Sequence, residues 1–96
     1  MKNYEVMTIS KKALGEEGFE TVSGLVKEAI SKVGGEVTNS TPWGRRKFAY
    51  KIDNETEGFY EVIDTDLPAT KVDALNTRLS LIEGLQRYLI SAKDSK

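Results

Sequence analysis

The stretch FETVSGLVKEAISKVGG at residues 19–35 decides the fold, because its pattern is the clearest in the chain. Its apolar residues recur at steps of three and four, which places them on one stripe of a helix. They are Phe19, Val22, Leu25, Val26, Ala29, Ile30 and Val33. Gly34 and Gly35 then end the helix, because glycine readily adopts the left-handed conformation of a helix exit.

The residues before this helix predict a strand and a loop. Tyr4 to Ile9 is a β-type run with partial alternation, which predicts a strand. Ser10 to Gly18 is polar and contains two glycines, which predicts a loop that leads into the helix at Phe19.

The residues after the helix predict a hairpin. In residues 36–52, apolar Phe48, Tyr50 and Ile52 alternate with Lys47, Ala49 and Lys51, so one face is apolar and the other largely cationic. Pro42 and Gly44 mark a bend part-way along this strand. Residues 53–58 form a polar turn by composition, and residues 59–66 resume a strand.

A second helix and a last strand complete the chain. Residues 67–69 break the preceding strand, and Thr70 with Asp73 fits a capping box at the start of a helix. The helix has one apolar stripe and ends at Gly84; the stripe consists of Val72, Leu75, Leu79 and Ile82. Residues 85–92 predict the final strand, and residues 93–96 a frayed polar end.

The order of elements is β-α-β-β-α-β, which predicts an α+β domain with the ferredoxin-like split βαβ fold. Right-handed crossovers then give a four-stranded antiparallel sheet with both helices on one face. Residues 1–96 are expected to form a single domain, since 96 residues suffice for one core and not for two. The other face of the sheet is left open, and function is expected there.

The composition argues against an enzyme or a metal protein. The chain contains no cysteine and no histidine, which removes thiol nucleophiles, disulfides and the commonest general base and zinc ligand. The acidic pairs Glu16-Glu17 and Glu55 with Glu57 lack a neighbouring base or metal ligand set, and so are expected to be surface acids. We therefore expect no catalytic residue, no metal and no cofactor.

The charge and the ends of the chain bear on partners and location. Fourteen basic and 15 acidic residues give a net charge of −1, which argues against a stand-alone basic nucleic-acid binder but allows a local basic patch. No apolar run approaches the roughly 20 residues that span a bilayer, and the first residues show no signal peptide. A cytoplasmic location without membrane contact is expected.

The densest feature of the chain is WGRRKFAY at residues 43–50. Three consecutive cations between aromatic residues suit contact with RNA phosphates and stacking on bases. The same cations also suit a solvated edge strand, where they discourage aggregation. Trp43 fits a core or hinge position as readily as a recognition role. Arg87 adds a cation on the last strand, where Tyr88 is more simply explained as an amphipathic packing residue.

The segment WGRRKFAYKI at residues 43–52 resembles the signature of the bacterial small-subunit (30S) ribosomal protein S-six family, which reads Gly-basic-Arg-polar-Leu-Ala-Tyr-Pro-Ile. The opening residues 4–6, the glycine pair at 34–35 and the closing segment IEGLQRYLI at 82–90 are similar in place and spacing. The resemblance covers essentially the whole chain. Phe48 stands where leucine is usual and keeps an apolar side chain, so the expected fold is unchanged. Lys51 stands where proline is usual, which restores a backbone N–H and adds a cation, and this alters the hairpin rather than the role.

This resemblance implies a structural protein of the small ribosomal subunit with a split βαβ fold. It implies binding to the central domain of 16S ribosomal RNA, jointly with the small basic ribosomal protein numbered eighteen. By position, the RNA-binding candidates are Arg45, Arg46, Lys47 and Arg87. Arg45 and Lys47 share one face of an alternating strand, whereas Arg46 lies with the apolar set and fits a partly structural role. A basic partner would explain the near-neutral charge.

Two other classes of function remain open at this point. The same fold hosts small-ligand-binding regulatory domains, and fold alone does not decide function. Such modules bind ligands at glycine-bearing loops, whereas the glycines here are expected at helix exits and turns. An enzyme of this fold is disfavoured by the missing histidine and cysteine.

Overall fold

Four strands alternate with two α-helices in the predicted order in the computed structural model. The structure describes residues 2–52 and 55–93, with the side chains of all of these except residues 45, 46, 48–52, 55 and 56. The elements are β1 (Lys2–Lys11), α1 (Gly15–Lys32), β2 (Glu36–Ile52), β3 (Glu55–Leu67), α2 (Val72–Ser80) and β4 (Leu85–Ala92). Short 3-10 helices, η1 (Lys12–Leu14) and η2 (Ala69–Lys71), precede α1 and α2.

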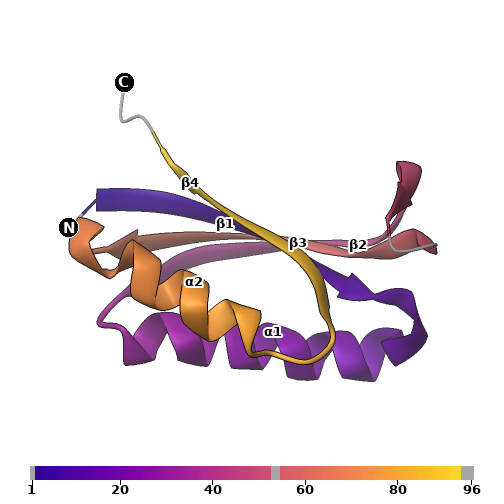
Figure 1. Cartoon of the computed structure of the whole chain (residues 1–96), viewed down its shortest axis with the longest axis horizontal. Helices are drawn as coiled ribbons and strands as arrows, with labels where there is room; N and C mark the ends of the chain where they lie inside the picture. Colours follow the sequence, from indigo (N-terminus) through magenta and orange to yellow (C-terminus); the bar gives the residue numbers. More distant parts are fainter. Residues whose placement is uncertain (1, 53–54, 94–96) are drawn as a thin grey trace.

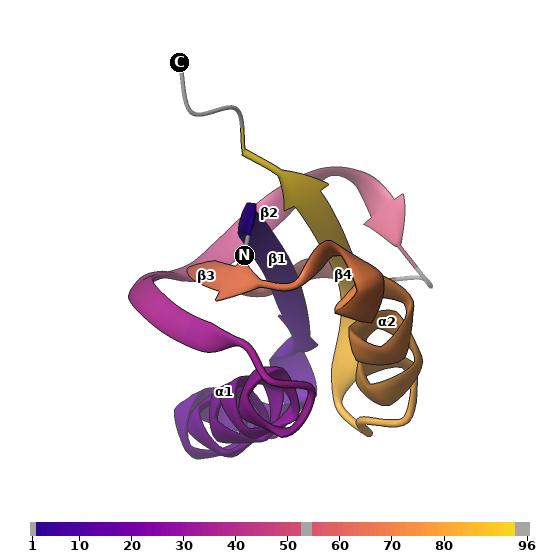
Figure 2. The same cartoon turned by 90° about the vertical axis from the view of Figure 1, so that its left-hand side faces the viewer.

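The strands form one antiparallel sheet in the order β2-β3-β1-β4. Both helices pack on the same side of this sheet, and the other side carries no helix (Figures 1 and 2). The arrangement confirms the predicted split βαβ fold. It leaves β1 and β3 in the centre, each paired with a strand on either side, and β2 and β4 at the edges.

The core lies between the sheet and the helices. Alternate residues of the central strands point into it, including Val6 of β1 and Ile63 of β3, both completely buried. The helices contribute the stripes that the sequence predicts; their buried members are Val22, Val26, Ala29 and Ile30 of α1 and Leu75 and Leu79 of α2. Two members of the α1 stripe are less buried: Phe19 is half-buried, and Leu25 has 42% of its surface exposed.

The exit of α1 has the glycine geometry that its sequence predicts. Gly34 has φ of 88°, and the Gly35 N–H donates to the Ile30 carbonyl at 2.9 Å, which is the long hydrogen bond of a Schellman motif. A Cβ on Gly35 would lie 2.9 Å from Leu67 Cδ1, so glycine also allows the chain to pass close to the core. The predicted helix end is confirmed.

The prediction of a loop over residues 10–18 is wrong. Strand pairing continues to Lys11, which stands opposite Gly58 of β3, and α1 already begins at Gly15. Gly15 has φ of 69°, so it turns the chain from η1 into α1. A glycine in a polar segment is equally typical of a loop, and composition alone does not distinguish the two. Two acidic residues in the first turn, Glu16 and Glu17, suit the positive end of the helix dipole.

Three predicted boundaries around α2 and β3 also need correction. Thr70 does not cap α2, because it lies inside η2, where the Lys71 N–H donates to the Pro68 carbonyl at 2.9 Å. The helix ends at Ser80 rather than at Gly84. The predicted turn over 53–58 was too long, since β3 begins at Glu55; residues 53 and 54 lie outside the described residues, as do residues 94–96 of the expected frayed end.

The bend predicted within β2 is present. The pairing of β2 with β3 shifts register between Pro42 and Gly44, so Trp43 is the extra residue of a β-bulge. Trp43 is 49% exposed, which excludes the core position considered for it. An apolar face is expected from Phe48, Tyr50 and Ile52. Their side chains are not among those that the structure describes, so this expectation stays a prediction.

We expect the chain to unfold as one cooperative unit, because β1, α1, β3, α2 and β4 all contribute residues to one contiguous apolar cluster. Urea titrations followed by far-ultraviolet circular dichroism and by Trp43 fluorescence should give coincident transitions, with or without EDTA. Midpoints that differ between the two probes would contradict a single domain.

Candidate functional site

The uncovered face of the sheet is organised by the register of its strands. Residues directly opposite each other in an antiparallel pair lie on the same face, so the odd-numbered residues of β1 mark this open face. From Glu5 to Lys11 the open face extends about 20 Å along β1. Three zones follow one another over this length.

The middle zone is apolar. Met7 of β1 stands opposite Val62 of β3 on one side and Leu89 of β4 on the other, so the three side chains form a row across three strands. Met7 and Val62 are half-buried, and 55% of Leu89 is exposed. We call these three residues the apolar row.

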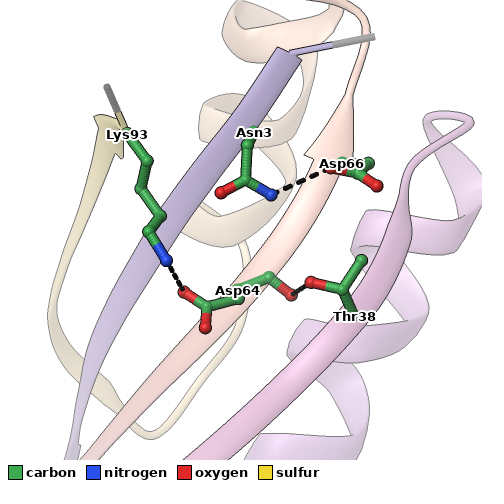
Figure 3. A network of polar contacts seen from close by, with 5 residues as sticks. All are labelled: Asn3, Thr38, Asp64, Asp66 and Lys93. Carbon is green, nitrogen blue, oxygen red and sulfur yellow. Dashed lines mark hydrogen bonds and ion pairs between the residues drawn. The ribbon is translucent and has the colours of Figure 1, made fainter. Parts of the chain in front are cut away.

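One end of the open face is acidic. Glu5 stands opposite Asp64, and Asn3 stands opposite Asp66, whose carboxylate accepts a hydrogen bond from the Asn3 amide at 2.9 Å. The Lys93 ammonium contacts the Asp64 carboxylate at 3.1 Å, and the Asp64 backbone carbonyl accepts from the Thr38 hydroxyl (Figure 3). We call Glu5, Asp64 and Asp66 the acidic end.

The opposite end of the open face is basic. Arg87 of β4 stands opposite Ile9, and the next open-face position of β1 is Lys11, which pairs with Gly58. Gly58 in turn pairs with Arg46 of β2. The register therefore brings positions 11, 46 and 87, which are remote in sequence, to one end of the sheet.

Arg45 and Lys47 flank Arg46 where the β2–β3 hairpin leaves the sheet. They stand opposite Phe59 and Glu57, so the register places both positions on the helix-side face of the hairpin, whereas Arg46 is on the open face. Since β1 pairs with β3 only as far as Gly58, the hairpin projects beyond the central strands (Figure 1). Lys47 is exposed. Gly44, next to Arg45, belongs to the same cross-sheet row as Tyr60, Ile9 and Arg87, which spans three strand spacings or about 14 Å.

The fold brings Arg87 to the same end of the sheet as Arg45, Arg46 and Lys47. The sequence indicated these four as RNA-binding candidates, and that role stays a prediction. It missed Lys11 and Lys12, both exposed; the signal was a pair of lysines directly after a strand-like run. The interpretation of Tyr88 as an amphipathic packing residue is confirmed, because Tyr88 is partly buried against the core.

The acidic residues of the described chain form no metal site. Glu16 and Glu17 are exposed at the start of α1, and no group of three or more carboxylate side chains in residues 2–52 and 55–93 could hold a metal ion. None of the helices in that part of the chain is long and apolar enough to cross a membrane.

Comparison with known proteins decides the family. The family model described as ribosomal protein S6 matches residues 3–92. The small ribosomal subunit protein bS6 of Dictyoglomus turgidum is 38% identical over 91 residues, covering 95% of this chain and 94% of that protein. Its counterpart in Thermoanaerobacter pseudethanolicus is 35% identical over 94 residues, covering 98% and 99%. The chain belongs to the ribosomal protein S6 family.

A solved structure supports both the family and the fold. The crystal structure of the 30S ribosomal protein S6 from Thermotoga maritima superimposes with a TM-score of 0.90 at 27% identity, covering 96% of this chain and 87% of that chain. The P2 domain of the Thermotoga maritima chemotaxis kinase CheA superimposes with a TM-score of 0.58 at 17% identity, which concerns the fold alone. As an S6 family member, the chain is a structural protein of the small ribosomal subunit rather than an enzyme.

Replacing Leu89 by lysine should leave the S6 family fold intact. Leu89 lies on an edge strand with more than half of its surface exposed, so the free energy of unfolding should change by no more than about 0.5 kcal/mol. Ile63→Ala, in the buried core, should cost about 2–5 kcal/mol in the same urea titration. A decrease of more than about 2 kcal/mol in Leu89→Lys would mean that the apolar row is part of the core.

Proposed function

We propose that this chain binds the central domain of 16S ribosomal RNA together with the small-subunit protein numbered eighteen, as a cytoplasmic component of the ribosome. The observation that carries the proposal is the division of the open face into a basic end at Lys11, Arg46 and Arg87, an apolar row and an acidic end. Arg45 and Lys47 add cations on the other face of the same hairpin, so this end is basic on both faces. Because the chain belongs to the S6 family, the small ribosomal subunit is the assembly in which these surfaces would be used.

The basic end suits ribosomal RNA. Arg45, Arg46 and Lys47 lie where the hairpin leaves the sheet, and Arg87 lies across the sheet at the same end. Cations at the end of a sheet can contact successive phosphates, and each phosphate that they neutralise releases counterions from the RNA. Tyr60, half-buried between Gly44 and Ile9, adds an aromatic ring at this end that suits stacking.

The rest of the open face suits a basic protein. The apolar row exposes hydrophobic surface that a protein partner would cover, and the acidic end complements a positively charged partner. The two functions support each other, because a basic partner beside the chain adds cationic surface that its own net charge of −1 does not provide.

Replacing Arg45 and Lys47 together by alanine should weaken the complex with central-domain RNA and the partner. The slope of log affinity against log salt should fall by about one unit for each phosphate that the variant no longer neutralises. Filter-binding titrations at several salt concentrations measure this slope.

Lys32→Ala with Lys71→Ala is the matched control, because it removes the same charge from exposed positions of α1 and η2. An unchanged affinity and slope in the Arg45 and Lys47 variant would place the RNA-binding surface elsewhere and leave these cations as a solvated edge.

Replacing Leu89 by lysine should reduce partner-dependent assembly at least tenfold, because it places a charge in the apolar row and opposite a basic partner. Leu81→Lys is the matched control: this leucine is 77% exposed but follows α2, on the helix side of the sheet. Equal affinities of the two variants for the partner, measured by calorimetry, would contradict the use of the open face.

A further inference from the structure

A groove runs along the helix side of the sheet between α1 and β2, away from the open face. Two hollows of about 470 and 410 Å³ adjoin each other, since Phe19 and Glu20 line both. One wall is α1, and the other is formed by Ser40, Pro42 and Gly44 of β2. The groove lies on the opposite side of the sheet from the apolar row and the acidic end, and Arg45, opposite Phe59, stands beside it.

Small residues keep this groove open. Gly24 lies in the interior of α1, where glycine destabilises a helix relative to alanine. A Cβ on Gly24 would meet no atom within 4 Å, so no packing neighbour requires glycine at this position. Gly44 on the opposite wall differs, because its φ of 76° by itself favours glycine. At Gly24, the α1 wall therefore leaves space that a larger side chain could have filled.

The floor combines aromatic rings with a buried carboxylate. The rings of Phe19 and Phe59 stack with centroids 5.3 Å apart and planes inclined by 20°. Only 3% of the Glu61 side chain is exposed, and its Oε1 accepts a hydrogen bond from the Ser23 hydroxyl at 2.7 Å. The Lys27 ammonium lies 3.7 Å from Oε2, which is an ion pair longer than an ordinary hydrogen bond.

The rim adds negative charge. Glu16 and Glu20 are exposed beside the hollows, and neither forms an ion pair with any residue that the structure describes. Lys12, which also lines the groove, contacts Glu57 at 3.8 Å instead. The carboxylates of the rim and floor would repel RNA phosphates and attract a cation.

We propose that the α1–β2 groove binds an arginine side chain carried by an extended segment of a basic protein. A guanidinium is planar, stacks on aromatic rings and donates two parallel hydrogen bonds to a carboxylate. The half-buried ring of Phe19 and the exposed carboxylate of Glu20, which line both hollows, match these two contacts, and the buried Glu61 adds negative charge beneath them. Ser40, Pro42 and Gly44 leave room for the backbone of the segment along β2.

The test is a titration of the ¹⁵N-labelled full chain, followed by nuclear magnetic resonance, with the capped peptide Gly-Ser-Arg-Gly-Ser-Arg-Gly-Ser. The amide signals of Gly15, Gly24 and Gly44 should shift saturably. The same peptide with citrulline, the uncharged isostere of arginine, should bind at least tenfold more weakly, because it cannot form charge-assisted hydrogen bonds. Equal binding of both peptides, or shifts confined to Met7 and Leu89 on the open face, would overturn the proposal.

Gly24→Met fills the groove while improving the helix, so the variant should unfold at a temperature no lower than that of the natural chain and bind the peptide at least tenfold more weakly. Thr21→Met is the matched control, exposed on the same helix and outside both hollows. Unchanged peptide binding by Gly24→Met would refute the groove as the site.

Two further outcomes identify other occupants and also refute the proposal. Shifts of the three glycines on addition of a uridine heptamer, without a response to the arginine peptide, would assign the groove to RNA. Shifts that grow with protein concentration alone would assign it to a second copy of the chain. Unchanged RNA and partner assembly by Gly24→Met would leave the proposed function intact, whatever the peptide result.

Discussion

Two helices cover only one face of this four-stranded sheet, and the rest of the structure depends on that constraint. Because side chains alternate across each strand, the central strands must serve two environments at once. Val6 and Ile63 are completely buried beneath the helices, whereas Met7 and Val62, one position away, lie on the open face. A shift of one residue in either strand would exchange these two sets.

The same constraint leaves several surfaces of this domain available for contact with partners. The open face has a direction along the strands, from the acidic end at Glu5 to the basic end at Lys11 and Arg87. On the helix side, the edge strand β2 carries small residues beside α1, and a groove remains between them. Edge strands and uncovered faces are where a small domain meets its partners.

The sequence predicted the elements whose side chains repeat with a clear period and missed those set by contacts between strands. The α1 stripe and the glycine exit at Gly34 are local properties, and both were predicted correctly. The start of α1 was missed, because strand pairing carries β1 as far as Lys11 and leaves only η1 before Gly15. The capping role expected for Thr70 failed because η2 replaces the cap with a backbone hydrogen bond.

The sequence by itself determined the order of the elements, the family and the basic segment at Arg45, Arg46 and Lys47, because these follow from local periodicity and a contiguous motif. Only the tertiary structure decided that Arg87 and Lys11 lie at the same end as this segment, that Met7, Val62 and Leu89 form one row, and that Glu61 is buried beneath α1. The reason is register: which residues stand opposite each other depends on hydrogen bonds between strands far apart in the chain, and no local pattern specifies that alignment.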